Sequence, residues 1–276
     1  MKSIPIVSKK PSTVAAFRSA CDKSGGDFIP VILKDHDAII SYFNYELPEI
    51  KILDFGDGDT AAEKIMDVIH ADPWLLFGGI IAIVQDNKQK IEMEKQRDPN
   101  ILLILRRPDF EANTDRILRI LTQNKQFLFN RGMQQQMNTN ETGSFVSDND
   151  PMDILFYCNL ITSYLYNTNR INDEGRAGIQ GALMELLLNA VEHGNCRISY
   201  EEKTEWLSAG KNMLDLIAQK CRDPAALNKK VYISYDISNL RTRISVRDDG
   251  DGFDWRKRLE GELKAGLHGM GIKLAE

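Results

Sequence analysis

Short apolar runs alternate with amphipathic stretches through the first half of the chain. The apolar runs are rich in β-branched residues and leucine, and they fall at residues 4–7, 28–33, 50–55, 80–84 and 101–105. Runs that are nearly continuous in apolar residues are typical of strands covered on both faces by helices. Five such strands with helical stretches between them predict an α/β domain with a doubly wound, parallel five-stranded sheet over residues 1–130.

The stretches between these runs have helical spacing. Residues 11–21 open with Pro11, and proline is tolerated in the first turn of a helix. From residue 59 to residue 70, apolar side chains recur three, four and seven positions after Ala62, as on one face of a helix.

A polar segment separates the two halves of the chain. Residues 131–150 are rich in Gln, Asn, Thr, Ser and Asp and poor in large apolar residues, which predicts a linker. Phe145 and Val146 could form a short edge strand of the second domain, which we place at residues 151–276.

Composition narrows the class of protein. The chain has 276 residues, of which 42% are hydrophobic and 27% charged, as expected for about two globular domains. The net charge of −5 argues against nucleic acid as a partner, because nucleic-acid phosphates need a basic surface. The N-terminus lacks the apolar run of a signal peptide, and no stretch reaches the ~20 apolar residues that cross a bilayer. We therefore expect a cytoplasmic protein with no membrane partner.

The four cysteines are far apart in the sequence and form no C-x-x-C pair. They fit neither a zinc site nor the dense disulfide framework of a small secreted domain. We expect reduced and mostly buried thiols at Cys21, Cys158, Cys196 and Cys221.

The first candidate site element is a polar stripe on a helix predicted over residues 176–193. Glu185, Asn189 and His193 recur every fourth residue, so they would lie on one side of that helix. An asparagine oxygen can ligate Mg²⁺, and a glutamate can take a proton from a hydroxyl group. An amphipathic helix with an exposed polar face would show the same stripe.

The second element follows a predicted hairpin. Residues 231–234 and 243–247 alternate as two neighbouring strands would, with a turn at residues 238–240. The second strand runs into Asp248, followed by Gly250 and Gly252, and glycines there allow a sharp turn and a close approach to a ligand. An aspartate in this position can accept a hydrogen bond from the amino group of adenine. The alternatives are an acidic turn or a calcium loop, but the spacing of an EF-hand is absent.

The third element is a glycine-rich segment ahead of a predicted helix. It contains Gly266, Gly269 and Gly271. Glycines before a helix N-terminus expose backbone N–H groups to phosphate oxygens, and the helix dipole favours the negative charge.

The order of these three elements resembles the N box, G1 box and G2 box of the GHKL ATPases, which include gyrase, heat-shock 90 proteins, histidine kinases and MutL. The run Asn189-Ala190-Val191-Glu192-His193-Gly194 is similar to the N box of the anti-sigma-factor serine kinases. The resemblance covers residues 150–276. It implies a two-layer α/β sandwich that binds ATP with Mg²⁺.

The resemblance also implies roles for the matching residues. Glu185 would be the catalytic general base, and Asn189 would ligate Mg²⁺ between the phosphates. Asp248 would bind the adenine amino group. His193 would either contribute to the nucleotide site or only cap and pack the end of its helix. Glycines would shape the floor of the pocket and the lid over the phosphates, at Gly250, Gly252, Gly266, Gly269 and Gly271.

Three features depart from the family pattern. A helical-looking insertion at residues 200–226 separates the N box from the hairpin. The segment between Gly252 and Gly266 is short, which suits the lid of the serine kinases better than that of the histidine kinases. The family continues beyond the G2 box with a helix and further strands, so we expect a chain trimmed at its C-terminus.

The five-strand pattern of the first half resembles a response-regulator receiver domain. Asp54 would stand where the phosphoacceptor aspartate lies, and Arg107-Pro108 follows the fifth strand, where the family has Lys-Pro. Receivers hold Mg²⁺ with an acidic pair after the first strand, and here Ser8-Lys9-Lys10 stands there. Without those ligands Asp54 would be a poor phosphoryl acceptor, so we expect a pseudo-receiver.

Together these resemblances predict a signalling protein, namely an ATP-dependent serine/threonine protein kinase or anti-sigma-like switch regulated through its receiver-like domain. The implied partner is an anti-anti-sigma-like substrate or a sigma factor, and the family suggests a homodimer. One alternative is a non-catalytic module whose nucleotide shapes a partner surface. Another is a relative of the histidine kinases without a phosphoacceptor histidine, since residues 151–169 contain no histidine.

Overall fold

The computed structural model describes residues 2–57, 61–124, 141–238 and 240–252. The chain divides into two compact units. Unit 1 comprises Met1–Thr139 and Ser163–Asn172, and unit 2 comprises Asn140–Thr162 and Asp173–Glu276. No helix in the described ranges combines the length and apolar character needed to cross a membrane.

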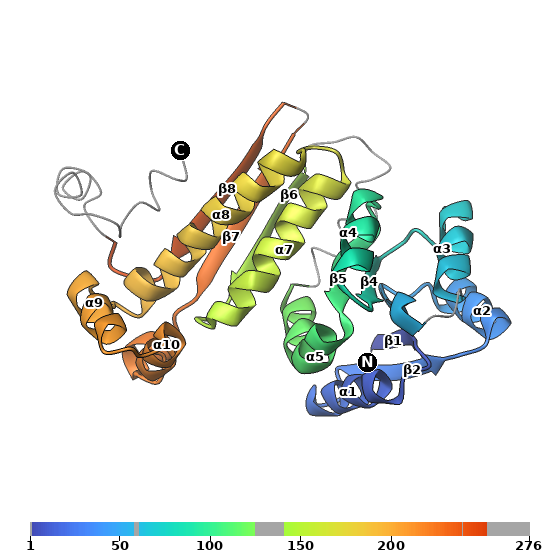
Figure 1. Ribbon diagram of the computed structural model, residues 1–276, viewed down its shortest axis with the longest axis horizontal. Helices are drawn as coiled ribbons and strands as arrows, with labels where there is room; N and C mark the ends of the chain where they lie inside the picture. Colours follow the sequence, from blue (N-terminus) through green and yellow to red (C-terminus); the bar gives the residue numbers. More distant parts are fainter. Residues whose placement is uncertain (1, 58–60, 125–140, 239, 253–276) are drawn as a thin grey trace. The chain divides into compact units, whose positions relative to one another are not determined.

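Unit 1 is built on a parallel five-stranded sheet, as the sequence predicts. The strands follow the order β2-β1-β3-β4-β5, which is one of the two common orders of doubly wound sheets. Their bounds are β1 Lys2–Val7, β2 Phe28–Leu33, β3 Ile50–Asp54, β4 Gly79–Val84 and β5 Ile101–Arg106 (Figure 1). Strands β3 and β4 are buried along their whole length, and apart from Lys51 and Asp54 they contain only apolar residues and glycine.

Helices cover both faces of this sheet. Crossovers between parallel strands are almost always right-handed, so a strand order that runs in both directions from β1 places helices on both faces. Helices α1 and α5 pack against each other, while the core on the other face joins α2, α3 and α4 to the strands. The helices are α1 Pro11–Lys23, α2 His36–Glu46, α3 Ala61–Ala71, α4 Asn87–Lys95 and α5 Arg107–Gln123, with the 3₁₀ turn η1 at Phe55–Asp57.

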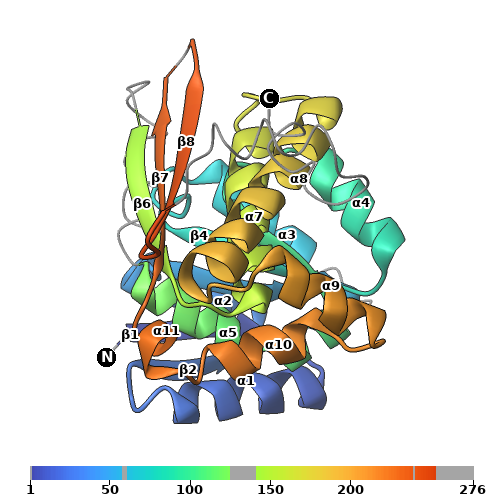
Figure 2. The ribbon, with the colours of Figure 1, turned by 90° about the vertical axis from the view of Figure 1, so that its left-hand side faces the viewer.

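Unit 2 contains a separate antiparallel sheet of three strands in the order β6-β7-β8. Two long helices, α7 and α8, run side by side along one face of this sheet (Figures 1 and 2). The strands are β6 Glu141–Ser147, β7 Val231–Ile237 and β8 Thr242–Asp248. The helices are α7 Pro151–Asn167, of which residues 151–162 belong to unit 2, α8 Asp173–Asn189, α9 Tyr200–Ser208, α10 Met213–Lys220 and α11 Pro224–Leu227, with the π-helix η2 at Ala190–Asn195.

Aromatic residues join the helices of unit 2 to its sheet. The ring of Phe145 on β6 lies 5.6 Å from that of Tyr157 on α7 and 5.8 Å from that of Tyr235 on β7. The hydroxyl of Tyr157 donates a 2.8 Å hydrogen bond to the carbonyl of Val146. Phe145 and Tyr157 are both buried, so this cluster forms part of the core.

The strand β6 corrects the sequence interpretation of residues 131–150 as a linker. Phe145 and Val146 do lie on an edge strand, but that strand runs from Glu141 to Ser147 and pairs with β7 along its whole length. Its pairing uses backbone groups, to which a polar composition gives no clue. Residues 125–140 lie outside the described residues.

Two further predicted elements of unit 2 lie in the described residues and are present there. The hairpin joins β7 and β8, and its turn is closed by a 2.8 Å hydrogen bond from Ser238 N to Arg241 O. The insertion at residues 200–226 is helical and forms α9, α10 and most of α11.

A lysine is buried in the middle strand of unit 1. Lys51 on β3 is 1% exposed, and its ammonium group donates hydrogen bonds to the carbonyls of Phe77 at 2.6 Å and Pro48 at 3.3 Å. Burial lowers the pKa of Lys51 to about 8 from its usual 10.5, because the charged form loses hydration. Because this pKa differs between the folded and the unfolded chain, the stability of the protein depends on pH through Lys51.

We expect the free energy of unfolding to rise as the pH becomes alkaline, because Lys51 has a lower pKa in the folded protein than in the unfolded chain. Between pH 8 and pH 10.5 the unfolded chain binds more protons than the folded one, so the free energy of unfolding rises with pH, by at most about 1.4 kcal/mol per pH unit. Urea unfolding of wild type and Lys51→Met at several pH values measures this difference. Lys64→Met, at an exposed position on α3, is the control. A wild-type minus Lys51→Met difference that is flat with pH would contradict the prediction.

Candidate functional site

The helix that carries Glu185 and Asn189 changes its winding at its C-terminal end. Helix α8 ends at Asn189, and the chain continues as the π-helix Ala190–Asn195. Glu185 is exposed and Asn189 is half-buried. His193 lies within this π-helix and not on α8. The structure therefore places Glu185 and Asn189 one turn apart on α8, as the sequence predicts, and His193 on the π-helix that follows.

His193 has a local structural contact. Its Nδ1 lies 2.6 Å from the carbonyl oxygen of Ile198. A carbonyl can only accept, so Nδ1 carries the proton and donates this bond. The contact holds the turn that follows the π-helix, in line with the capping and packing alternative for this residue.

The structure brings the end of the π-helix against the turn that follows β8. A Cβ added to Gly194 would come within 3.0 Å of the carboxyl carbon of Asp248. A Cβ added to Gly250 would lie 2.5 Å from the carbonyl oxygen of Gly194. Both positions therefore require glycine because another segment of backbone or a fixed side chain occupies the space.

The Asp248 carboxylate is held in a defined orientation by its own turn. Gly250 N donates a 2.8 Å hydrogen bond to Asp248 Oδ1. Gly252 is exposed and has a φ of +75°, which glycine adopts without strain. Asp248, Gly250 and Gly252 thus lie together beside the π-helix, whereas Gly266, Gly269 and Gly271 lie outside the described residues.

Asn195 is the polar residue of this region that sequence reasoning missed. It is 1% exposed, and its side chain makes three hydrogen bonds. Nδ2 donates to Asn149 Oδ1 at 2.8 Å and to Lys230 O at 3.0 Å, while Oδ1 accepts from Asp249 N at 2.9 Å. The amide therefore joins the π-helix to the segment after β6, the residue before β7 and the end of β8.

Charged side chains connect the same region to the insertion. Glu192 is buried in the π-helix, and its Oε2 lies 2.5 Å from the ammonium of Lys203 on α9. Arg197 has a φ of +52° and forms a 2.7 Å ion pair with Asp251. No signal in the sequence marks these two pairs, because each joins residues whose proximity depends on the fold.

The described part of the chain contains no group of three or more His, Cys, Asp or Glu side chains that could hold a metal ion. Asn189, which the sequence nominates as a Mg²⁺ ligand, offers a half-buried amide at the junction of α8 and the π-helix.

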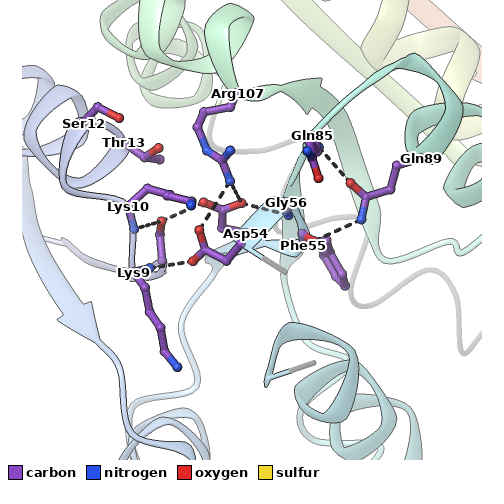
Figure 3. Close-up of polar contacts among 12 residues, drawn as sticks. Lys9, Lys10, Ser12, Thr13, Asp54, Phe55, Gly56, Gln85, Gln89 and Arg107 are labelled. Atoms are coloured by element: carbon purple, nitrogen blue, oxygen red, sulfur yellow. Dashed lines mark hydrogen bonds and ion pairs between the residues drawn. The ribbon is translucent and has the colours of Figure 1, made fainter. Parts of the chain in front are cut away.

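A second polar cluster lies in unit 1 at the carboxyl end of β3, where Asp54 is 3% exposed (Figure 3). Asp54 Oδ2 accepts a 2.7 Å hydrogen bond from Ser8 Oγ. Asp54 Oδ1 accepts from Gly56 N at 3.0 Å and from an Nη of Arg107 at 2.9 Å. Both carboxylate oxygens of Asp54 therefore already have donors from within the chain.

The guanidinium of Arg107 also reaches a second carboxylate. The same Nη lies 3.4 Å from Asp57 Oδ1, and Lys9 N donates a 2.6 Å hydrogen bond to Asp57 Oδ2. Ser8 and Lys9 follow β1, whereas Arg107 begins α5 after β5, so three parallel strands deliver the cluster to one edge of the sheet. The side chain of Arg107 supplies the positive charge next to both acids.

Burial raises the pKa of the Asp54 carboxyl above its usual value, and the negative charge of Asp57 raises it further. The hydrogen bond from Ser8 and the charge and hydrogen bond of Arg107 oppose this rise. The buried carboxyl is thus surrounded by donors, while burial and the neighbouring Asp57 carboxylate raise its pKa on balance.

A comparison of the chain with models of protein families finds no match. A comparison with curated proteins also finds no match.

We expect Asp54 to resist phosphorylation by a small phosphodonor. Its two oxygens are engaged by Ser8, Gly56 and Arg107, and a phosphoryl group would have to displace these buried hydrogen bonds. Incubation with acetyl phosphate and Mg²⁺, followed by intact-mass measurement, should show unmodified protein. The prediction is wrong if the mass rises by one phosphate group in wild type and not in Asp54→Asn.

Proposed function

We propose that unit 2 is an ATP-binding domain of the GHKL type and that the protein is an ATP-dependent serine/threonine protein kinase or anti-sigma-like switch. The observation that carries this proposal is the packing of Gly194 against Asp248 and Gly250. These residues belong to two motifs that are more than fifty positions apart in the sequence and that resemble the N box and G1 box.

The chemistry of these residues suits a nucleotide. An ionised aspartate accepts hydrogen bonds only, so Asp248 can pair with the amino group of adenine. The bond from Gly250 N fixes the direction in which this carboxylate points. The glycines beside it allow the flat base to approach the backbone closely.

The residues on α8 would face the phosphate end of the ligand. Asn189 would hold Mg²⁺ through its amide oxygen, and the metal would neutralise charge on the phosphates. Glu185 lies one turn earlier on α8 and is exposed, so its carboxylate can meet a hydroxyl group from a partner. It would remove the proton of that hydroxyl as a general base. Gly266, Gly269 and Gly271 would cover the phosphates.

Unit 1 would act as a sensor or docking domain of the pseudo-receiver type. Its strand order β2-β1-β3-β4-β5 is that of flavodoxin-like domains, and Asp54 is the last residue of the third strand. The internal cation Arg107 and the hydroxyl of Ser8 engage Asp54, which suits a domain that binds a partner without being phosphorylated. The partner in this proposal is an anti-anti-sigma-like substrate or a sigma factor.

Nucleotide binding should depend on Gly194 and Asp248. The methyl group of Gly194→Ala would displace the Asp248 carboxylate, and Asp248→Asn would replace an acceptor-only group with an amide. Each change should raise the Kd for ATP by about tenfold or more, which is about 1.4 kcal/mol. Isothermal titration calorimetry in the presence of Mg²⁺ measures the Kd.

Two checks separate a binding defect from a folding defect. Gly181→Ala on α8 adds a methyl group into open space, so it should keep the wild-type Kd and stabilise the helix by about 0.5–1 kcal/mol. Urea unfolding of every variant identifies those that are folded. Equal ATP affinity in wild type and folded Gly194→Ala and Asp248→Asn would remove these residues from the proposed pocket.

Glu185 should act in chemistry and not in binding. Glu185→Gln should keep the Kd for ATP and lower phosphoryl transfer to a captured partner protein by ~10²–10⁴-fold, because an amide cannot accept the proton. Glu174→Gln, at an exposed position in the first turn of the same helix, should leave the rate unchanged. The readout is transfer of radiolabelled phosphate from ATP. Wild-type turnover in Glu185→Gln, or ATP binding without transfer in wild type, would favour the non-catalytic binding module.

A further inference from the structure

Two cysteines that are distant in the sequence lie next to each other in unit 2. The Sγ atoms of Cys196 and Cys221 are 3.4 Å apart, although 25 positions separate the residues. Cys196 is 4% exposed, and Cys221 is half-buried. A disulfide needs an S–S distance of about 2.05 Å, so a movement of little more than ~1 Å shared by the two side chains would join them.

The pair stands where the insertion meets the π-helix. Cys196 follows the π-helix directly, and its N–H donates to Val191 O at 2.9 Å. Cys221 directly follows α10 as its C-cap, and its N–H donates to Ile217 O at 2.8 Å. Hydrogen bonds at the two helix ends thus anchor the backbone of both cysteines, and this keeps their sulfur atoms next to each other.

The two thiols have unequal electrostatic surroundings. The S–H of Cys196 lowers the pKa of the Cys221 thiol by hydrogen bonding to its sulfur, against an opposing effect of burial. The same hydrogen bond, together with burial, raises the pKa of Cys196, while the ammonium of Lys229 acts in the opposite direction. Cys221 is therefore the better nucleophile of the two, and Cys196 is a thiol held beside it.

The other two cysteines have neither a neighbouring thiol nor an accessible side in their described surroundings. Burial raises the pKa of Cys21 to about 11 and that of Cys158 to about 12. Both are buried, Cys21 on α1 and Cys158 on α7. They serve as internal controls because a buried thiol with a high pKa reacts slowly.

We propose that Cys196 and Cys221 form a redox-sensitive dithiol that a hydroperoxide converts to an intramolecular disulfide. The Cys221 thiolate attacks the terminal peroxide oxygen, the O–O bond breaks, and the leaving oxygen takes a proton to become water or an alcohol. The product is a sulfenic acid at Cys221. The sulfur of Cys196 then attacks the Cys221 sulfur, the S–O bond breaks, and water leaves with the Cys196 proton. Two thiols lose two electrons, and the peroxide gains them.

The disulfide would tie the insertion to the π-helix by a covalent bond. The same region already holds Glu192 to Lys203, and Cys221 Sγ donates a 3.6 Å hydrogen bond to the carbonyl of Asn149. Asn149 in turn accepts from Asn195, the residue that holds Asp249. Closing the loop would therefore restrict α9 and α10 and would stiffen the turn after β8. This inference does not require that the region bind a nucleotide.

The test uses the full chain and hydrogen peroxide. After brief exposure and alkylation, peptide mapping of the wild type should show a Cys196–Cys221 linked peptide, a loss of two hydrogen atoms in the intact mass and two remaining alkylatable thiols. A dithiol reductant should restore all four. In reduced protein, iodoacetamide should label Cys221 at least ~10-fold faster than Cys21. The oxidised protein should also resist limited proteolysis within residues 200–226 and melt several degrees higher.

Matched variants decide between the proposal and general oxidation. Cys221→Ser, at a half-buried helix end, should abolish the linked peptide, and the double variant Cys21→Ala/Cys158→Ala should form it as the wild type does. Four alkylatable thiols in oxidised wild type, a disulfide between two molecules, or a sulfenic acid that persists at Cys221 while Cys196 is present would each overturn the proposal. The wild-type mapping alone suffices if a variant fails to fold.

Discussion

The geometry of unit 2 depends on the buried amide of Asn195. Moving an amide out of water costs about 1–3 kcal/mol unless it is hydrogen-bonded, and here three partners engage it. These partners belong to Asn149, Lys230 and Asp249, which stand after β6, before β7 and after β8. One side chain therefore fixes the end of the π-helix relative to all three strands, and this brings Gly194 against Asp248.

The candidate site residues of the two units differ in exposure. In unit 1, Asp54 is surrounded by donors from its own chain, among them the guanidinium of Arg107, so its hydrogen-bonding capacity is satisfied internally. In unit 2, Glu185 is exposed and Asn189 is half-buried at the end of α8. The Asp54 cluster of unit 1 is thus closed by its own hydrogen bonds, whereas the Glu185 side chain of unit 2 is exposed.

The insertion at residues 200–226 is attached at the same place as the candidate nucleotide site. Lys203 pairs with Glu192 of the π-helix, Lys220 pairs with Glu202 at 2.8 Å, and Cys221 touches Cys196. The first and last of these contacts join a helix of the insertion to the π-helix or to the residue after it. A change in the position of α9 or α10 would therefore act on the residues that orient Asp248, because the contacts between them are short and direct.

The sequence by itself determined the elements whose signal is local. Continuous apolar runs predicted the five parallel strands of unit 1, and alternation predicted the hairpin of β7 and β8, because burial on two faces or on one leaves a period in the chain. The same reading identified Glu185, Asn189 and Asp248 from residue type and spacing, and their proposed roles in ATP chemistry stay a prediction.

Only the tertiary structure decided which distant residues meet. Strand β6 was hidden in a polar segment because its pairing with β7 uses backbone groups. The change from α- to π-helical winding at Ala190 is not marked in the sequence, and neither the Asn195 hydrogen bonds nor the Cys196–Cys221 contact has a periodic signature. Each of these depends on a partner far away in the sequence, and spacing along a chain carries information only about neighbours on the same element.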